Sequence, residues 1–478
     1  MSSGTRCRLY ACLVALLLLP VPALPDSLPT SVARALARHG IPESAVSIEI
    51  RDIESRRPVF SLNSDVPRNP ASVVKLVTTL GALQLFGPHH QWETQYYLDG
   101  SLKDDALLGN LVLRGGGDPF LTVDRLWHHV MSLRGLGIRD IVGNLIIDNT
   151  LYDIPEHDRT AFDNSPNRLY NVGPDAALVN FSSTRFVIHP VQGRIAVHAE
   201  PPLDGIELAT RLKSGTGKCV SKKRGWNYRI DRDADIVHVR FEGTYRADCG
   251  VHSISRSVLP NNDYAFRLFR LLWTQSGGTL SGSYRVGRRP ETAVLLSSHR
   301  STPLSDAVTS INKYSNNVMA RMLFLNLDTQ DENEPATLAG ARQRVADWLA
   351  ANHIEIPGLY VDNGSGLSRT TRITATGMAE LLQLGWESPY SPEFLSSLPL
   401  AALDGTMKKR LHDSHVAGRA RIKTGSLNGV RSMAGYIIAR DGKPYSVTML
   451  MQSDKVTYRN GSEVQDAVLK WINSTVGL

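Results

Sequence analysis

The two ends of the chain carry the same mixture of helical and strand-like patterns. Apolar residues recur at helical spacing over residues 30–39 and again in the stretch that follows Ser72. Alternating apolar and polar residues predict paired strands at 45–53 and 58–63. Towards the other end, the same patterns predict helices at 304–327, 336–352 and 464–472, and strands at 429–439 and 445–452 joined at Asp441-Gly442. The two ends are therefore expected to share one antiparallel sheet covered by helices, in an α+β domain.

The middle of the chain has a different pattern, with short strands and turns from residue 92 onwards. It predicts a helix at 123–133 and strands at 141–148 and 234–242. The glycine-rich stretch at 109–118 lacks the Lys-Ser/Thr of a phosphate loop, so we interpret it as a turn. We expect two nested, mostly β insertion domains to interrupt the terminal domain. The expected division is 24–92 and 293–478 for the discontinuous terminal domain, 93–180 and 278–292 for insertion domain II, and 181–277 for insertion domain III.

Residues 1–23 are typical of an export signal rather than of a folded element. Arg6 and Arg8 form a positive segment, residues 9–19 are apolar but too few to span a bilayer comfortably, and Val21-Pro22-Ala23 offers a cleavage site. Cleavage near Ala23 would leave an exported protein. No second long apolar run follows, so no transmembrane anchor is expected in the mature form.

The composition is typical of a globular protein of several domains, with 42% hydrophobic residues. The net charge is +7, and two units lower once Arg6 and Arg8 are cleaved off, with the charge spread along the chain. Such a mild, dispersed charge argues against nucleic-acid binding, which needs a concentrated basic surface. It leaves only a weak attraction to an anionic envelope polymer.

Cleavage of the signal also removes Cys7 and Cys12, which leaves Cys219 and Cys249 in an oxidising compartment. We expect these two to form a disulfide, whose loop of about 30 residues would contribute roughly 3–4 kcal/mol in the chain-entropy model. Two unpaired buried thiols are the alternative. No C-x-x-C or H-E-x-x-H motif accompanies these cysteines, so no metal site is predicted.

Candidate chemistry lies in Asn69-Pro70-Ala71-Ser72-Val73-Val74-Lys75-Leu76, at the predicted start of a buried helix. Pro70 suits a first helical turn, and positions three apart share a helix face, so Lys75 is expected beside the Ser72 hydroxyl. Unpaired N–H groups at the start of the helix could hold a developing anion. The pair therefore has the composition of a nucleophile with an adjacent base.

The S-x-x-K spacing alone is weak evidence, because Ser310-Ile311-Asn312-Lys313 matches it as well. Two further motifs follow in the chain: Ser315-Asn316-Asn317 in a helical context, and Lys423-Thr424-Gly425-Ser426 just before a predicted strand. Lys213-Ser214-Gly215 imitates the last motif but precedes the second, so it breaks the order. The ordered set resembles the three motifs of penicillin-recognising enzymes.

Other features narrow this resemblance to class C low-molecular-mass penicillin-binding proteins, the D-alanyl-D-alanine carboxypeptidase/endopeptidase group of serine DD-peptidases. The long gap between Ser72 and Ser315 matches a family that carries two extra domains there. Residues 362–369 resemble the family's D-G-S-G-L-S-R element, and residues 403–407 resemble its D-G-T-L turn. The resemblance implies a penicillin-recognising, β-lactamase-like domain in the periplasm, and we expect no cofactor.

The resemblance also implies a role for each motif residue. Lys75, its proton affinity lowered by burial and by Lys423, would deprotonate Ser72, which attacks the carbonyl between two D-alanines. The N–H groups of Ser72 and Ser426 would form an oxyanion hole, and Ser315 would pass a proton to the leaving amine. The implied substrate contacts are Asn317 with an amide, Lys423 and Thr424 with the terminal carboxylate, and Gly425, Ser426, Ser368 and Tyr170 in the pocket. Peptidoglycan stem peptides and cross-links would be substrates, and β-lactam antibiotics covalent inhibitors.

Two alternatives stay open. A secreted serine β-lactamase or esterase predicts a glutamate that activates water, and the sequence has neither the E-x-x-L-N element of class A enzymes nor a G-x-S-x-G elbow. An inactive peptidoglycan-binding scaffold predicts that at least one of the three motifs is damaged, whereas all three are intact. One stretch departs from the family, because residues 162–170 match only loosely the segment that receives the stem-peptide side chain. Tyr170 could supply its aromatic group, and Asp163 or Asp175 its carboxylate.

Overall fold

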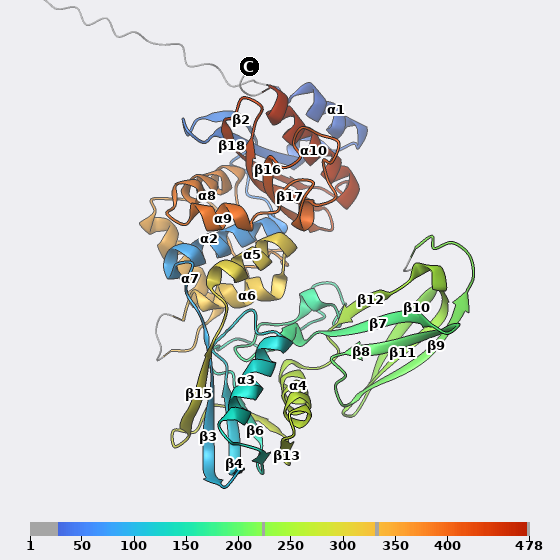
Figure 1. The fold of residues 1–478 in the computed structure, drawn as a ribbon. Coiled ribbons are helices and arrows are strands. Elements are labelled where there is room, and N and C mark those ends of the chain that lie inside the picture. Colours follow the sequence, from blue (N-terminus) through green and yellow to red (C-terminus); the bar gives the residue numbers. More distant parts are fainter. Residues whose placement is uncertain (1–26, 222–224, 330–333, 476–478) are drawn as a thin grey trace, which may run out of the picture.

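The computed structural model describes residues 27–221, 225–329 and 334–475 of an elongated molecule (Figure 1). The first described helix and the last one lie together at one end of the molecule, and the middle of the chain forms the other end. The expected export signal at 1–23 lies outside the described residues. Within the three described ranges, no helix is both long and apolar enough to cross a membrane.

A five-stranded antiparallel sheet joins the two ends of the chain, in the order β16-β17-β18-β1-β2. Its strands are β1 (Val46–Asp52), β2 (Pro58–Leu62), β16 (Ala420–Leu427), β17 (Val430–Ile438) and β18 (Pro444–Gln452). β1 pairs with β18, with Val46 opposite Met451. The shared sheet expected from alternation is therefore confirmed, and β16, which carries Lys423, forms one edge of it.

Helices cover both faces of this sheet. On one face, α1 (Thr30–Arg38) packs against α10 (Tyr458–Thr475) over an apolar core. The other face carries α2 (Lys75–Phe86), α5 (Leu304–Tyr314), α6 (Asn317–Asn326), α7 (Leu338–Ala351), α8 (Ala375–Glu387) and α9 (Ser391–Ser397). α2 contacts each of the other five helices. Its residues from Lys75 to Leu83 are all buried, as expected for a central helix that is apolar on every side.

The inserted part of the chain begins with a second sheet, in the order β13-β5-β4-β3-β15, with β6 between β4 and β14. Its strands are β3 (Glu93–Lys103), β4 (Ala106–Arg114), β5 (Asp140–Ile141), β6 (Leu145–Asp148), β13 (Thr279–Leu280), β14 (Tyr284–Val286) and β15 (Val294–Arg300). α3 (Val123–Gly135) and α4 (Asn261–Gln275) pack against each other beside it (Figure 1). Of the glycine-rich stretch at 109–118 that was predicted as a turn, residues 109–114 belong to β4 and residues 115–118 follow the strand.

A nested β module lies to one side of the second sheet (Figure 1). It contains two three-stranded sheets, β10-β11-β9 and β12-β7-β8. The strands are β7 (Thr184–Val191), β8 (Arg194–Glu200), β9 (Ile206–Gly215), β10 (Trp226–Asp233), β11 (Ile236–Arg246) and β12 (His252–Arg256). The rings of Phe186 and Phe241 lie 5.9 Å apart between the two sheets. Cys219 and Cys249 form the expected disulfide.

Two expected domain boundaries are wrong. The sequence predicts that the chain returns to the terminal domain at residue 293, but β15 pairs with β3 in the second sheet. The nested module is expected to extend to residue 277, but α4 packs against α3 instead. Apolar periodicity identifies a strand or a helix without identifying the element it packs on. We therefore propose that the nested module ends near Arg256 and that the terminal domain resumes after Arg300.

The chain leaves and re-enters the terminal domain at one place. The N–H of Ser301 donates to the carbonyl oxygen of Trp92 at 2.9 Å, and the Trp92 N–H donates to Ser301 Oγ at 3.0 Å. Just beyond, the N–H of Leu304 donates to the carbonyl oxygen of His90 at 2.8 Å. These bonds hold the two crossings together between the end of α2 and the start of α5, so the insertion stands beside the helices that follow Ser72 and precede Ser315.

Candidate active site

Ser72 lies in a 3₁₀ turn (Ala71–Val74) that leads directly into α2, so it precedes the α-helix instead of lying within it. Ala71 has a φ of 44°, in the left-handed region. Asn69 holds this bend, because its Oδ1 accepts from the N–H of Ala71 at 2.8 Å and its Nδ2 donates to the carbonyl oxygen of Ser368 at 2.9 Å. The local fold therefore presents the serine on a fixed backbone.

Two glycines let neighbouring backbone come close to this turn. A Cβ added to Gly425, in β16, would lie 2.9 Å from the backbone nitrogen of Ser72 and 2.7 Å from the carbonyl oxygen of Pro70. A Cβ on Gly366 would lie 2.0 Å from the carbonyl oxygen of Ala71, and the φ of Gly366 is +77°. A larger residue at either position would force the backbones apart. The edge strand β16 thus runs alongside the N–H of Ser72.

The Lys75 side chain is fully buried among neutral oxygen atoms. Its Nζ donates to Ser72 Oγ at 3.0 Å, to Asn317 Oδ1 at 2.6 Å, and to the carbonyl oxygen of Ser365. A neutral amine has two N–H donors and one lone pair. The amide and carbonyl oxygens can take both donors, which leaves the lone pair for the Ser72 hydroxyl proton. The geometry therefore accommodates Lys75 as a proton acceptor.

The electrostatic surroundings favour the neutral form of Lys75. Burial lowers the pKa of Lys75 well below its ordinary value, and the charges of Lys423 and Arg321 lower it further. A neighbouring carboxylate would act in the opposite direction, but no carboxylate is among the partners that Nζ has in the described part of the chain. These are the conditions under which a lysine can serve as a base near neutral pH.

The second and third motifs meet through one hydrogen bond. Ser315 ends α5 with a left-handed backbone, at φ 56°, and its Oγ accepts from Lys423 Nζ at 2.9 Å. Burial lowers the pKa of Lys423 to about 7. Thr424 Oγ1 donates to Thr406 Oγ1 at 2.9 Å, which connects β16 to the turn at 403–407. A row of polar groups therefore extends from Ser315 along the edge strand to that turn.

Two cavities, of about 500 and 610 Å³, meet at Ser72. The first is lined by Tyr314, Ser315, Thr406, Thr424, Gly425 and Arg431, the second by Phe162, Asp163, Leu367, Arg369 and Asp454, and both by Tyr170, Asn317, Ser426 and Tyr458. Cavities of this size are typical of ligand sites. The serine therefore stands where a chain-like substrate could extend in two directions.

Of the predicted substrate contacts, Lys423 lines neither cavity, and neither does Ser368. Ser368 is 4% exposed, and its Oγ accepts from the N–H groups of Thr370 at 3.1 Å and Thr371 at 3.3 Å. It is thus a turn residue behind the site. In the same element, Ser365 contacts Lys75 through its carbonyl oxygen.

The loosely matching stretch at 162–170 contributes to the cavity walls. Tyr170 donates from its hydroxyl to Asp163 Oδ2 at 2.7 Å, and both residues line the second cavity. Asp175 lies elsewhere, 9% exposed, where its Oδ2 accepts from Asn149 Nδ2 at 3.0 Å. Of the two carboxylates that the sequence leaves open, Asp163 is therefore the one near the serine.

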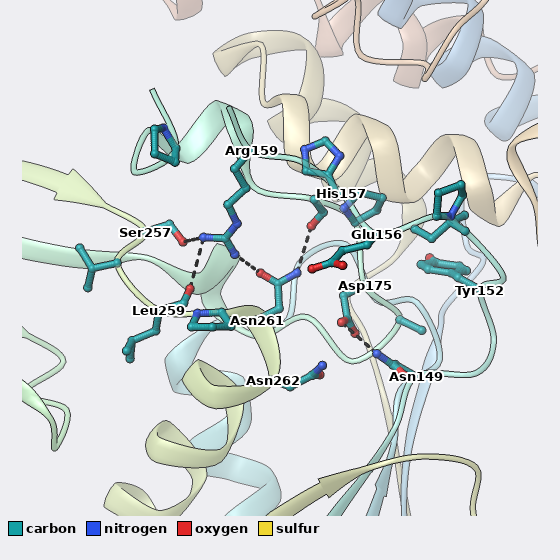
Figure 2. Close-up of a pocket in the computed structure, with 18 of the residues that line it drawn as sticks. Asn149, Tyr152, Glu156, His157, Arg159, Asp175, Ser257, Leu259, Asn261 and Asn262 are labelled. Atoms are coloured by element: carbon teal, nitrogen blue, oxygen red, sulfur yellow. Dashed lines mark hydrogen bonds between the residues drawn. The ribbon is translucent and has the colours of Figure 1, made fainter. Parts of the chain in front are cut away.

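A separate cavity of about 620 Å³ lies between residues 149–176 and the start of α4 (Figure 2). Arg159 donates there to Ser257 Oγ at 2.8 Å, to the Leu259 carbonyl oxygen at 3.2 Å and to Asn261 Oδ1 at 2.7 Å. These contacts hold the segment that carries Arg159 against the start of α4 and the residues just before it. Although acidic side chains and a histidine line this cavity, no group of three or more His, Cys, Asp or Glu in the described ranges is placed to hold a metal ion. None of the three motifs reaches it.

The imitating motifs lie in other surroundings. Lys213-Ser214-Gly215 ends β9, in the nested module. Lys313 lies in the last turn of α5, where its Nζ donates to Asp404 Oδ2 at 2.6 Å and to the carbonyl oxygen of Leu398 at 2.7 Å. The second S-x-x-K thus supplies an ion pair to the 403–407 turn.

Sequence reasoning missed residues that shape the site from behind. Arg321 is 5% exposed, donates to the carbonyl oxygens of Tyr170 and Val172 at 2.9 and 2.8 Å, and lowers the pKa of Lys75. It follows Asn317 by four positions on α6, so a shared helix face was the available signal. Arg431, on β17, lines the first cavity.

Known proteins resemble this chain along most of its length. The family model described as the D-Ala-D-Ala carboxypeptidase 3 (S13) family matches residues 28–475. The chain is 26% identical over 422 residues to a D-alanyl-D-alanine carboxypeptidase of Actinomadura sp. (strain R39), covering 84% of this chain and 77% of that protein. It is 24% identical over 419 residues to D-alanyl-D-alanine carboxypeptidase DacB of Haemophilus influenzae, covering 84% of each.

Solved structures share the fold. The crystal structure of penicillin binding protein 4 (dacB) from Haemophilus influenzae matches with a TM-score of 0.76 at 20% identity, over 92% of this chain and 99% of that one. A predatory endopeptidase of Bdellovibrio bacteriovorus matches with a TM-score of 0.53 at 16% identity, over 90% of this chain and 92% of that one. Because the family model extends over nearly all the described residues, the chain belongs to the D-Ala-D-Ala carboxypeptidase 3 (S13) family of serine peptidases, among the class C low-molecular-mass penicillin-binding proteins.

Proposed function

We propose that the protein cuts both peptidoglycan stem peptides and their cross-links, as a D-Ala-D-Ala carboxypeptidase and DD-endopeptidase with an acyl-enzyme on Ser72. The observation that carries this proposal is the position of Lys75. Its Nζ is buried, lies 3.0 Å from Ser72 Oγ, has a pKa lowered by burial, and contacts only neutral oxygens among the described residues. A lysine in these surroundings suits a general base better than an ion-pair partner.

Acylation begins when the neutral Lys75 amine takes the proton of the Ser72 hydroxyl. Ser72 Oγ then forms a bond to the carbonyl carbon between two D-alanines, and the carbonyl oxygen becomes negative. We assign the stabilisation of that oxygen to the N–H groups of Ser72 and Ser426. The close approach that Gly425 permits between β16 and the Ser72 turn supports this pair of donors.

The leaving group needs a proton when the C–N bond breaks, because the electron pair of that bond stays on the amine nitrogen. Ser315 is the proposed proton carrier, since it lies at the end of α5 and its Oγ accepts a hydrogen bond from Lys423 Nζ at 2.9 Å. It receives the proton that Lys75 took from Ser72. Lys75 is then neutral again and can accept a proton from the water that hydrolyses the acyl-enzyme, which restores the Ser72 hydroxyl.

The carboxylate of the substrate explains why one site could cut two kinds of bond. Terminal D-alanine of a pentapeptide and the acceptor residue of a 4→3 cross-link each present a free α-carboxylate beside the scissile bond. We assign this group to Lys423 and Thr424, with Asn317 on the substrate amide. In both substrates the acyl donor is D-alanine. A Bdellovibrio protein named as an endopeptidase has the same fold, which is compatible with the second activity.

The same chemistry implies covalent inhibition by β-lactams, whose strained amide imitates the D-Ala-D-Ala bond. A structure of the Haemophilus influenzae protein complexed with a β-lactam matches with a TM-score of 0.71. The expected export signal at 1–23 and the disulfide Cys219–Cys249 support a periplasmic location, where both the polymer and an oxidising environment are found.

The test is chromatography of purified cross-linked muropeptides after incubation with the mature protein. Conversion of dimers to monomers and of pentapeptides to tetrapeptides is expected, and both conversions should be absent for Ser72→Ala. Cleavage that persists in Ser72→Ala would contradict the assignment of the nucleophile. Rapid penicillin turnover without muropeptide cleavage would favour a β-lactamase, and binding of muropeptides without either reaction would favour an inactive scaffold.

A further inference from the structure

A groove of about 750 Å³ lies along the nested β module, apart from the three motifs. One wall comes from β10 and the other from β12, and the stretch just before Tyr170 closes one side. Side chains that matter here are Trp226, Tyr228 and Ile230 from β10, Ile254 and Arg256 from β12, and Arg168. The proposed reaction makes no use of this groove.

Both walls of the groove are edge strands. β10 is the outer strand of the sheet β10-β11-β9, and β12 is the outer strand of β12-β7-β8. In the part of the chain that the structure describes, no strand pairs with the outer edge of either one. An edge strand presents a row of backbone N–H and C=O groups, and extended peptides are commonly recognised through such rows.

The charge of the groove favours an anionic occupant. Its described lining includes the guanidinium groups of Arg168 and Arg256 and no aspartate or glutamate. Arg256 is held in place by Tyr228, because its Nε donates to the Tyr228 hydroxyl and its guanidinium carbon lies 4.9 Å from the centre of that ring. Its Nη1 also donates to the carbonyl oxygen of Ser255 at 2.7 Å. A guanidinium fixed in this way can present its remaining N–H groups to a carboxylate.

One short stretch of chain contributes to both the groove and the Ser72 site. Phe162, Asp163 and Tyr170 line the cavity beside Ser72, while residues 164–168 line the groove. The Ser257 N–H donates to the carbonyl oxygen of Asn167 at 3.0 Å, which fastens this stretch to the end of β12.

Electrostatics connects the two places as well. The pKa of Tyr170 is raised, first by burial and then by Asp163, and the charges of Arg168 and Arg256 act against that rise. The charges of both guanidinium groups therefore influence the pKa of Tyr170, which lines the Ser72 cavity. A single extended substrate could therefore occupy both places.

We propose that this groove binds a second, carboxylate-bearing stem peptide of the same peptidoglycan molecule whose D-alanyl bond lies at Ser72. The inference rests on the proposed function and extends it from the scissile bond to the remote part of the substrate. A stem peptide offers backbone groups to the two edge strands and carboxylates to the two arginines. A sugar chain offers mainly hydroxyl groups, which would leave both guanidinium charges unmatched.

The test compares substrates of two sizes on paired variants of the full mature chain. The test variant is Arg168→Gln with Arg256→Gln. The matched control is Arg229→Gln with Arg240→Gln, which removes two arginines that face each other across β10 and β11. Arg229 alternates with the groove residues Tyr228 and Ile230, so it points to the opposite face of β10.

The test variant should raise the KM for a purified 4→3 cross-linked muropeptide dimer about tenfold, as expected when a remote charged contact worth about 1.4 kcal/mol is lost. Its kcat/KM for a short N-acylated D-Ala-D-Ala peptide, and both parameters of the control variant, should stay within about twofold of wild type. Arg168→Gln alone removes an exposed side chain and should show part of the effect without a change in melting temperature.

Binding is measured separately in Ser72→Ala, which cannot cleave the probe. The dimer should bind about tenfold more weakly after its carboxylates are amidated, and peptide-free glycan strands should not displace it. Equal affinity of free and amidated dimers, displacement by the glycan, or equal loss on the short peptide would each overturn the groove assignment. Absence of all cleavage by wild type, with the dimer still bound through its carboxylates, would instead refute the proposed function and leave the groove in place.

Discussion

The chain contains the S-x-x-K spacing twice, at Ser72–Lys75 and at Ser310–Lys313, and the two copies lie in opposite electrostatic surroundings. Lys75 has none of its surface exposed, and its Nζ contacts three neutral oxygens, one of which is Ser72 Oγ. The Lys313 side chain is 13% exposed, and its Nζ lies 2.6 Å from an Asp404 carboxylate oxygen. The spacing is the same, but the partners differ.

This difference teaches that the partner, more than the spacing, decides whether a lysine can act as a base. A carboxylate favours the ammonium form, whereas burial without a carboxylate favours the amine. The second copy has a different task. Lys313 ties the end of α5, two residues before Ser315, to the turn that carries Thr406. It therefore supports the first site from outside.

The largest difference between the two copies is expected when their serines are replaced. Ser72→Ala should abolish covalent labelling by a fluorescent penicillin, because no other hydroxyl is placed beside Lys75 Nζ among its described partners. Ser310→Ala should leave labelling unchanged. The measurement is gel fluorescence followed by peptide mapping of the labelled residue. Label on Ser310, or label that survives in Ser72→Ala, would reverse the roles of the two copies.

The lysines come next in expected effect. Lys75→Met keeps an apolar chain of similar length in a fully buried position, and it should slow acylation by about 10² to 10⁴, the usual range for a lost general base. Stopped-flow acylation kinetics measure this rate, and thermal melting checks that the fold persists. A loss of less than about tenfold would remove Lys75 from the role of base.

A pH series tests the charge states of the site lysines in the wild-type protein, without any substitution. The pKa of Lys423 is lowered to about 7, so its charged form predominates at pH 6 and its neutral form at pH 8. If the charged form binds the substrate carboxylate, the binding-competent fraction falls about tenfold over that range, and KM should rise about tenfold. The lowered pKa of Lys75 acts in the opposite direction, because its neutral form grows with pH and the acylation rate rises with it.

The control for that series is Lys423→Arg, whose guanidinium stays charged throughout. It should show a KM that is flat between pH 6 and pH 8 for a peptide ending in a carboxylate. An equally flat KM in wild type would mean that Lys423 does not hold the carboxylate.

The smallest expected effect lies at the second copy. Lys313→Met should lower kcat/KM about fivefold, because it removes a partly exposed ion pair worth about 1 kcal/mol that positions the 403–407 turn. Asp404→Asn should have a similar effect, and the double variant should be no worse than either single one. Lys313→Arg should restore most of the activity. Additive losses in the double variant would show that the two residues act independently.

The sequence carried more information about the site than about the domains around it. Each motif includes a residue type that its chemistry needs, so Ser72, Ser315 and Lys423 could be selected by their order along the chain. The contact from Ser365 could not, because a backbone carbonyl oxygen has no residue identity. The left-handed Ala71 was equally hidden, since alanine gives no signal of positive φ.

The fold was predictable wherever two paired elements are neighbours in the sequence. The hairpin β17–β18 is joined by a recognisable Asp-Gly turn, and both strands were found. β15 was assigned to the wrong domain because its alternation shows a strand but does not show that β3, about 200 residues earlier, pairs with it. No helix was predicted at Asn261–Gln275, and these residues were assigned to the nested module, whereas α4 packs against α3. Local pattern sets the type of an element, and long-range packing sets its neighbours.

The pairing of β1 with β18 also constrains the order in which the protein can fold. Val46 lies opposite Met451, so the strand made first must wait for one of the last before the sheet can close. Such distant pairing makes folding slow and leaves strand edges exposed meanwhile. During that interval Ser72 and Lys75 already exist, but the burial that lowers the pKa of Lys75 does not. Under the proposed mechanism, Ser72 is therefore activated only once the sheet is complete, and a partly synthesised chain would not be acylated by a β-lactam.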